Sequence, residues 1–275
     1  MSETKDQRER IRSKIWEEVP ESNNPFAASV CYCYGYDVFG DVLRKASWSD
    51  YLYLLFAGER PSERQSQLLD ALALVLANPG PRDQSVRAAM NGGVGGSTSA
   101  ASLMAALAVG AGGLGGSREI FYAVQWWERC GTDLEVWQKV LAGQSRNEDL
   151  DIWPMMEHPA GFDPHGIDCT KPVRQCLDYL ASLCNDNALG FLKEYRKQLE
   201  LIAKKPLALP GVAAAAIFDL GFNADQAEML YLLLRLPGAA VHALEQKQNG
   251  WRKYPFFHNG VVLTDDPLQN EENTL

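Results

Sequence analysis

Hydrophobic residues recur at three- and four-residue steps along most of the chain, which is the spacing of one face of an α-helix. Residues 47–58 follow this period, with Ser47 or Ser49 as the expected N-cap and Gly58 as the stop. A second helix is predicted to begin at the cap Ser62 and to end where the sequence NPGP (78–81) breaks the period. The two elements together predict a helical hairpin.

The same period continues through the rest of the chain. Further helices are predicted over residues 119–130, 134–142, 173–185, 189–204, 212–220 and 225–247. Asn223 or Asp225 is the expected cap of the last helix. No run of alternating apolar and polar residues is long enough to predict a sheet. The expected fold class is therefore all-α, a compact bundle of many helices.

One predicted helix, over residues 100–109, differs from the others because it contains small and apolar residues and no bulky polar side chain. Small side chains let helix backbones approach closely, and a helix without a polar face is usually buried. We therefore expect this helix in the centre of the bundle.

Composition indicates one folded domain. Of the 275 residues, 46% are hydrophobic and 22% are charged, which is ordinary for a globular protein. A chain of this length can form one large helical domain, which we place at residues 15–263. It follows a charged segment (1–14) and precedes a polar, acidic tail (264–275) that we expect to be flexible.

Charge and apolar content restrict the partners. The formal net charge is −9, and no stripe of Lys and Arg compensates for it, so a nucleic-acid partner is not expected. Residues 1–14 contain no apolar signal region, and the longest apolar stretch (100–114) is shorter than the roughly 20 residues of a bilayer span. We expect a cytoplasmic protein without a membrane partner.

The six cysteines do not predict a metal site. They are scattered, and the one close pair, Cys31 and Cys33, has a spacing too short for a standard zinc knuckle. Reduced thiols and no bound metal are expected.

Several motifs then occur in a characteristic order. Residues 35–38 (GYDV) precede the segment 47–62, which contains the first predicted helix and ends LLFAGERPS. The sequence ANPGP follows at 77–81 and the glycine-rich sequence GGLGG at 112–116. Near the end of the chain, residues 235–247 read RLPGAAVHALEQK.

This order resembles the citrate synthase superfamily. There a G-Y-x-I/V turn precedes a helix ending L-L-x-G-x-x-P, a G-P-L-H-G-G loop follows, and a helix R-x-x-G-x-x-x-H-x-x-E/D-Q-K/R closes the domain. The compact length resembles the citryl-CoA lyase-type members, such as the lyase module of ATP-citrate lyase. The resemblance covers about residues 15–260.

The resemblance implies a homodimer or a larger homo-oligomer. It implies binding of a CoA thioester, such as acetyl-CoA, and an oxaloacetate-like dicarboxylate, and formation or cleavage of the carbon–carbon bond between them. Coenzyme A then enters as part of a substrate, and no covalently bound cofactor is expected.

Catalysis of this kind needs a proton acceptor and donors for a developing oxyanion. Where the resemblance places a histidine before the paired glycines, this chain has Leu114, which can also mark the lyase branch. Where it places the catalytic aspartate, this chain has Pro210, which cannot accept a proton. The missing aspartate is the larger departure from the family pattern.

Other residues are candidates for these roles. His165, in the sequence GFDPHG (161–166), corresponds to a second family histidine shifted by one inserted residue, and would polarise the substrate carbonyl; an exposed loop histidine is the alternative. His158 replaces it if the register differs. Asp163 and Asp219 are the remaining candidate bases, although Asp219 is expected to be a surface residue at the end of a helix.

Binding residues are better preserved. Arg235 matches the family arginine that holds a citrate carboxylate, a role suited to the two-pronged guanidinium, with a surface salt bridge as the alternative. His242 is a candidate for both catalysis and substrate binding. Gln246 lies four residues further along the same helix face, where the two side chains could bond to each other. The predicted contacts to CoA phosphates, or else a solvated charge cluster, are Lys247, Arg252 and Lys253.

The glycine-rich run at 92–97 (GGVGGS) does not predict a nucleotide site, because no strand precedes it and no Gly-Lys-Ser/Thr follows it. Close helix packing, or a loop that lines a CoA channel, is the better interpretation. Two functions stay open from the sequence: an enzyme of the citryl-CoA lyase or citrate synthase type with an altered acid–base set, and a paralogue that binds its ligands without turnover.

Overall fold

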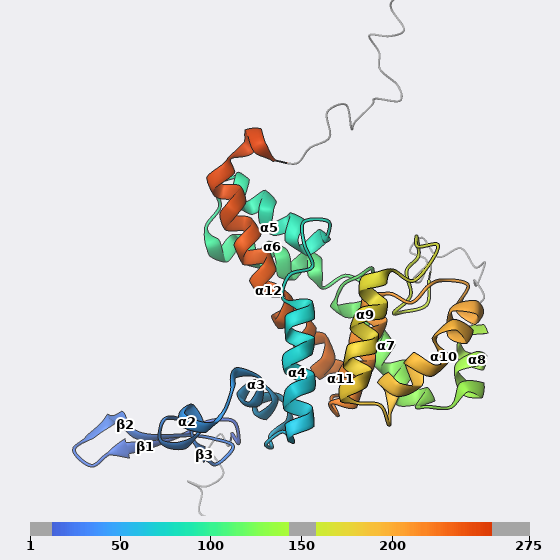
Figure 1. Ribbon diagram of the computed structural model, residues 1–275. Coiled ribbons are helices and arrows are strands. Elements are labelled where there is room, and N and C mark those ends of the chain that lie inside the picture. Colours follow the sequence, from blue (N-terminus) through green and yellow to red (C-terminus); the bar gives the residue numbers. More distant parts are fainter. Residues whose placement is uncertain (1–12, 143–157, 255–275) are drawn as a thin grey trace, which may run out of the picture.

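The computed structural model describes residues 13–142 and 158–254, and these form a helical body with a small sheet at one end (Figure 1). The sheet contains β1 (Glu17–Glu21), β2 (Asn24–Cys33) and β3 (Tyr36–Asp37), in that order and antiparallel. The helices are η1 (Val38–Val42), α2 (Leu43–Lys45), α3 (Trp48–Ala57), α4 (Glu63–Leu76), α5 (Gln84–Val94), α6 (Ser99–Gly110), α7 (Ser117–Cys130), α8 (Leu134–Ala142), α9 (Lys171–Leu183), α10 (Ala188–Ala203), α11 (Leu209–Asp219), α12 (Ala224–Asn249) and η2 (Trp251–Lys253). The all-α prediction is confirmed. The tail at 264–275, and all but the last two residues of the charged segment 1–14, lie outside the described residues.

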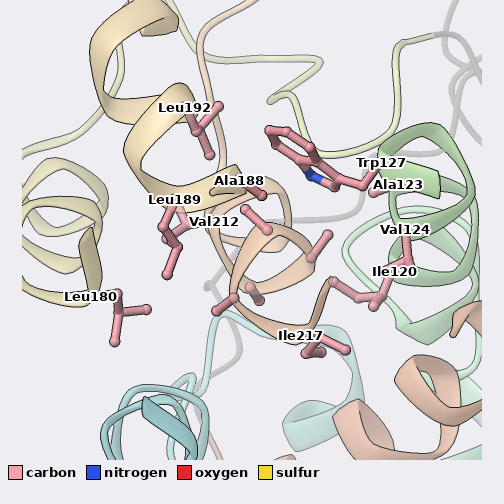
Figure 2. Close-up of a cluster of buried hydrophobic side chains, with 14 of the residues drawn as sticks. Ile120, Ala123, Val124, Trp127, Leu180, Ala188, Leu189, Leu192, Val212 and Ile217 are labelled. Atoms are coloured by element: carbon pink, nitrogen blue, oxygen red, sulfur yellow. The ribbon is translucent and has the colours of Figure 1, made fainter. Parts of the chain in front are cut away.

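The large hydrophobic core surrounds α11. Every residue from Gly211 to Ile217 is buried, and α7, α9 and α10 pack around this alanine-rich helix (Figure 2). Small side chains on α11 allow the surrounding helices to come close, and bulkier residues such as Trp127 and Leu189 fill the space between them. The dense packing fixes the N-terminal end of α11, which is part of the site described below.

A second, smaller core lies at the other end of α12. It joins α5, α6 and the C-terminal half of α12, through Val86, Met90, Ala106 and Ala239 among others. The N-terminal half of α12 belongs to the large core, through Leu230 and Leu234. The long helix α12 therefore connects the two cores (Figure 1).

A close backbone approach lets α12 pass the end of α4. A Cβ atom on Gly238 would lie 2.6 Å from the carbonyl oxygen of Ala77, and the Gly238 N–H donates to that oxygen. Pro237 stands inside α12, where a proline has no N–H to donate to the helix. The Pro237-Gly238 pair thus serves packing between α4 and α12.

The cap predictions of three helices are confirmed. The Ser47 side chain caps α3 in a capping box with Asp50, and Gly58 ends the helix with a positive φ of 78°. Ser62 caps α4 in the same way, and Asn223, rather than Asp225, caps α12. These local signals explain why the helix boundaries are readable in the sequence.

The expectation that the chain has no sheet was wrong. The β1–β2 ribbon projects from the helical body (Figure 1), and all residues of β1 and five of the ten residues of β2 are exposed. Phe26, near the start of β2, is 98% exposed. Because neither face of the ribbon is buried in this chain, its sequence does not show the alternation by which a half-buried strand is recognised.

The helix predicted at 100–109 exists as α6, but its expected central position was wrong. Ser102, Ala106 and Gly110 are its buried residues, and Met104 is 61% exposed. The helix lies on the outside of the smaller core, so one of its apolar faces is uncovered in the single chain. The neighbouring α5 was missed, because two glycines near its C-terminal end were taken as part of a glycine-rich loop.

Those glycines make close helix contacts. A Cβ on Gly93 would lie 2.3 Å from the carbonyl oxygen of Ala243 in α12, and one on Gly92 would lie 2.6 Å from Oγ of Ser102 in α6. The packing interpretation of residues 92–97 is thus supported.

Among the described residues, α12 is the one helix long and apolar enough to span a membrane by length and composition, and 44% of its apolar window is buried inside the protein. Buried core helices pass the same test, so this is weak evidence for a span. Cytoplasmic location and the absence of a membrane partner stay predictions.

Candidate functional site

A buried polar network begins at Arg235, on the inner side of α12. Arg235 is 6% exposed, and its guanidinium forms an ion pair with Asp83 and donates to the carbonyl oxygen of Gly115 at 3.0 Å. Asp83 also caps α5 by accepting from the N–H groups of Ser85 and Val86. Arg235 is therefore buried rather than in a surface salt bridge, and a carboxylate of the same chain, that of Asp83, already occupies its guanidinium.

Tyr231, one turn before Arg235, lies against the same cluster. The Arg235 guanidinium carbon stands 4.8 Å from the centre of the Tyr231 ring, and the hydroxyl lies 3.5 Å from the Gly115 carbonyl oxygen. Burial, with the nearby carboxylates of Asp83 and Glu119, raises the pKa of Tyr231 to about 12. The hydroxyl therefore keeps its proton and remains a donor.

The glycine-rich loop at 112–116 connects this cluster to Glu119 on α7. Glu119 is 2% exposed, and its Oε2 accepts from the Gly115 N–H at 2.5 Å. Gly115 has a positive φ of 69°, and a Cβ on Gly116 would lie 2.3 Å from the carbonyl oxygen of Gly112. The loop thus folds tightly enough to present its backbone to Arg235 on one side and Glu119 on the other.

The second oxygen of Glu119 reaches the segment after residue 158. Its Oε1 accepts from the Gly161 N–H at 2.8 Å and lies 3.5 Å from Nε2 of His158. The His158 side chain has no exposed surface, and neither of its ring nitrogens has a hydrogen-bond partner within the described part of the chain. A buried histidine whose ring nitrogens form no hydrogen bond is unusual and marks a functional candidate.

Gly161 also joins the network to the start of α11. Its carbonyl oxygen accepts from the Ala208 N–H at 3.0 Å, and its backbone packs against Gly211. Pro210, the residue in the expected catalytic position, is the neighbour of Gly211. The positions named by the family pattern thus lie near one another through backbone contacts, even though Leu114 and Pro210 bring no acid–base group.

His165 is placed differently from His158. It is exposed, and its backbone N–H donates to Oδ1 of Asp163 at 2.8 Å. Asp163 bonds to the backbone of His165 and of Pro206, outside the Arg235–Glu119 network. Of the two histidines considered from the sequence, His158 is the one that the fold brings to this network.

His242 and Gln246 do not bond to each other as suggested. The Nε2 of His242 lies 3.2 Å from Oδ1 of Asn78, and Nδ1 lies 3.5 Å from Glu245. The Gln246 side chain is 3% exposed and donates to the carbonyl oxygen of Gly250, at the end of α12. His242 therefore joins α12 to Asn78, and Gln246 stabilises the C-terminal end of α12.

The predicted CoA-binding residues lie at the far end of α12 and in η2. Lys247, Arg252 and Lys253 are all exposed. At 1.5 Å per residue, Lys247 stands about 18 Å along the helix from Arg235. Only an extended ligand could reach both.

The surface position expected for Asp219 was wrong. Its carboxylate caps α10 by accepting from the N–H groups of Ala188 and Leu189, at 2.8 and 3.0 Å. Burial raises its pKa above the ordinary value. Asp219 is therefore tied to the packing of α10 against α11, which accounts for its place in the sequence without a catalytic role.

Sequence reasoning missed Asp83, Glu119 and Tyr231. Glu119 occupies the third position of α7, where a glutamate often reaches back to the backbone before the helix, and Asp83 precedes α5 as a typical N-cap. These local signals were available. Their connection through Arg235 and Gly115 was not, because it joins residues far apart in the sequence. No cluster of three or more His, Cys, Asp or Glu side chains that could hold a metal is found in 13–142 and 158–254.

Comparison with solved structures shows that the fold is similar to that of citryl-CoA lyases and citrate synthases. The citryl-CoA lyase from Hydrogenobacter thermophilus superposes with a TM-score of 0.69 at 16% identity, over 95% of this chain and 99% of that one. The ATP citrate lyase from Methanothrix soehngenii, solved with citrate and coenzyme A, gives 0.69 at 17% identity over 92% of this chain. This chain spans 41% of that longer protein.

The citrate synthase from Thermotoga maritima is also similar, with a TM-score of 0.55 at 15% identity over 80% of this chain and 59% of that one. No family model matches the sequence, and no curated protein matches it either. The resemblance to the compact lyase-type members is thus confirmed at the level of the fold.

Proposed function

We propose that this protein binds a CoA thioester with an oxaloacetate-like dicarboxylate and cleaves or forms the carbon–carbon bond between them, as a citryl-CoA lyase-type enzyme. The observation that carries the proposal is the buried network in which Arg235 and the Glu119–His158 pair meet the two sides of one glycine-rich loop. Arg235 supplies a cation for a carboxylate, and His158 supplies a titratable ring in a site shielded from water.

The fold supports the substrate class. Among the similar structures, the ATP citrate lyase from Methanothrix soehngenii is described with citrate and coenzyme A, and a citrate synthase from Thermoplasma acidophilum with carboxymethyl coenzyme A and oxaloacetate. The latter has a TM-score of 0.51 and 17% identity, over 80% of this chain and 58% of that one. We extend that ligand class to this chain, with Lys247, Arg252 and Lys253 as candidate contacts for CoA phosphates.

A binding protein without turnover is the second candidate. Two observations favour it: Pro210 stands where the family pattern has its catalytic aspartate, and Asp83 occupies the guanidinium of Arg235. In that case the carboxylate or CoA would bind and no bond would be broken.

Two assays separate these functions. Purified protein is incubated with citryl-CoA, and oxaloacetate is measured with a coupled malate dehydrogenase; the reverse reaction is followed as thiol released from acetyl-CoA and oxaloacetate. Turnover that is lost in His158→Gln and kept in His165→Ala supports the proposed enzyme. No turnover in either direction, with CoA binding still detected by calorimetry, supports the binding protein.

We also propose that two copies of the chain associate through the outer face of the smaller core. Exposed apolar residues follow one stripe of α12 at steps of four, four and three residues: Leu233, Pro237, Val241 and Leu244. Met104 and Val109 on α6 are exposed as well. A second copy would cover apolar surface that a lone chain leaves in water.

A further inference from the structure

The carboxylate of Glu119 is buried without a fully charged partner at hydrogen-bond distance. Its two oxygens accept from two backbone N–H groups, Gly115 on Oε2 and Gly161 on Oε1. Backbone amides that point at a carboxylate form charge-assisted hydrogen bonds with it, so both oxygens of Glu119 have partners inside the protein. The titratable side chain in contact with Glu119 is that of His158, whose Nε2 lies 3.5 Å from Oε1.

The geometry of this contact distinguishes the two ring nitrogens. Nε2 faces the Glu119 carboxylate at 3.5 Å, while Nδ1 is buried and has no hydrogen-bond partner in the described part of the chain. A proton on Nε2 is attracted by the carboxylate, whereas a lone pair there would be repelled by it. The neutral ring should therefore carry its proton on Nε2, which leaves the lone pair on Nδ1.

We propose that Glu119 is a positioning residue that holds His158 in its Nε2–H form, so that Nδ1 serves as the proton acceptor that Pro210 cannot provide. This inference rests on the proposed lyase-type function for its chemical purpose. The Glu119–His158 pair lies beside the start of α11 that contains Pro210, because Gly161 bonds to Glu119 and packs on Gly211. A carboxylate that orients a histidine by its second nitrogen is a common arrangement in acid–base sites.

Because His158 has no exposed surface in the chain without substrate, substrate binding has to open this site first. In the cleavage direction, Nδ1 would then take the proton of the substrate hydroxyl. The oxygen electrons form the new carbonyl of the keto acid, and the carbon–carbon bond breaks with its electron pair passing to the thioester enolate. The imidazolium then returns the proton to the enolate carbon, which completes acetyl-CoA, so no proton is gained or lost overall. The Glu119 anion stabilises the imidazolium between these two transfers.

The first test reads the tautomer directly. Protein labelled with ¹⁵N-histidine is studied by two-dimensional NMR, and the His158 signals are assigned from a His158→Gln sample. We expect a protonated Nε2 and an unprotonated Nδ1 in the neutral ring. A neutral His158 with its proton on Nδ1 would overturn the proposal, whatever the activity of the protein.

The second test changes the pair. Glu119→Gln replaces the carboxylate by an amide of nearly equal size, and we expect the Nε2–H preference to be lost. We expect kcat to fall by about 10- to 100-fold, the range found when the carboxylate partner of a metal-bound histidine is replaced. KM should change less than kcat, and the acidic limb of the pH–rate profile should move. Glu119→Asp, which keeps the charge, should recover part of the rate and the tautomer.

Glu128→Gln is the matched control, because Glu128 is another carboxylate on α7 that accepts from a backbone N–H, that of Ala224. It should leave the His158 tautomer and the pH profile unchanged. If Glu119→Gln leaves both unchanged as well, Glu119 has only a structural role and the proposal is wrong. If the wild type shows no turnover but His158 still has the Nε2–H tautomer, the proposed lyase activity is wrong, and the positioning of His158 by Glu119 is still supported.

Discussion

Gly161 and Gly211 pack backbone against backbone, and neither position has room for a side chain. A Cβ on Gly161 would lie 2.7 Å from the Gly211 Cα, and one on Gly211 would lie 2.4 Å from the Gly161 carbonyl oxygen. Through this contact the start of α11 supports the segment that bonds to Glu119. The two glycines therefore join the large core to the candidate site.

Gly211→Ala should destabilise the protein. The added methyl overlaps a backbone oxygen and the Leu207 side chain, which would lie at 2.8 Å, and overpacking of this kind costs about 1 to 3 kcal/mol. The free energy of unfolding, measured by denaturant titration, should fall by that amount, and any lyase activity should fall with it. Gly112→Ala is the control, because the added Cβ would lie an ordinary 3.4 Å from the carbonyl oxygen of Val109. Equal stability of the two variants would contradict the close packing.

The ion pair between Asp83 and Arg235 predicts an opposition between stability and ligand binding. Asp83→Asn keeps an oxygen that can cap α5 but removes the charge that pairs with Arg235. Since loss of one partner of a buried pair typically costs about 3 to 5 kcal/mol, we expect a clear drop in thermal stability without ligand. The freed guanidinium should bind a dicarboxylate more tightly, so citrate should raise the melting temperature of the variant more than that of the wild type.

Asp41→Asn serves as the control for this prediction. Asp41 pairs with Lys45 and Arg60, but these basic side chains are 72% and 60% exposed, and such surface pairs contribute little. Its stability and its response to citrate should match the wild type. A wild-type chain that binds citrate more tightly than Asp83→Asn would show that Asp83 does not compete with the ligand.

Two aspartates near the start of α10 predict opposite pH effects on stability. Burial raises the pKa of Asp219, so its protonated form is favoured in the folded chain. Its contribution to stability is therefore present below the ordinary pKa of 3.8, and it is lost as pH rises through the higher pKa of the folded chain. The hydrogen bond from Arg64 lowers the pKa of the exposed Asp186, whose contribution is present above 3.8 and is lost as pH falls through the lower folded value.

Denaturant titrations of Asp219→Asn and Asp186→Asn across this acidic range measure both effects. As pH rises from below 3.8, the wild type should lose stability relative to Asp219→Asn and gain it relative to Asp186→Asn. If the stability of the wild type relative to each variant changes with pH in the same direction for both variants, the buried environment of Asp219 or the Arg64 contact of Asp186 is wrong.

Features encoded locally could be predicted from the sequence, and features formed at a distance could not. The caps Ser47, Ser62 and Asn223 mark helix starts because each bonds within its own first turn. The β1–β2 ribbon lacks a buried face, so its pattern gave no signal. The choice of His158 over His165 depends on contact with Glu119, about 40 residues earlier in the chain, and no local pattern encodes that contact.

The exposed stripe on α12 makes self-association a measurable consequence of the fold. Leu244 and Val241 are each 54% exposed, and Met104 on α6, a helix whose composition predicted a buried position, is 61% exposed. A helix that is small and apolar yet exposed in a single chain is explained if a second copy packs against this region. Leu244→Glu would place a charge in that contact, where burial without a partner is costly.

Sedimentation velocity should therefore show a dimer for the wild type and a shift to monomer, or a loss of affinity of at least tenfold, for Leu244→Glu. Leu201→Glu is the matched control, because Leu201 is a 79% exposed leucine on α10, a helix of the large core rather than the smaller one. It should leave the dimer intact. If dimers persist in Leu244→Glu and dissociate in Leu201→Glu, the contact lies at the other end of the molecule. If the wild type is a monomer, the proposed association is wrong, because the stripe on α12 is then exposed in the working protein.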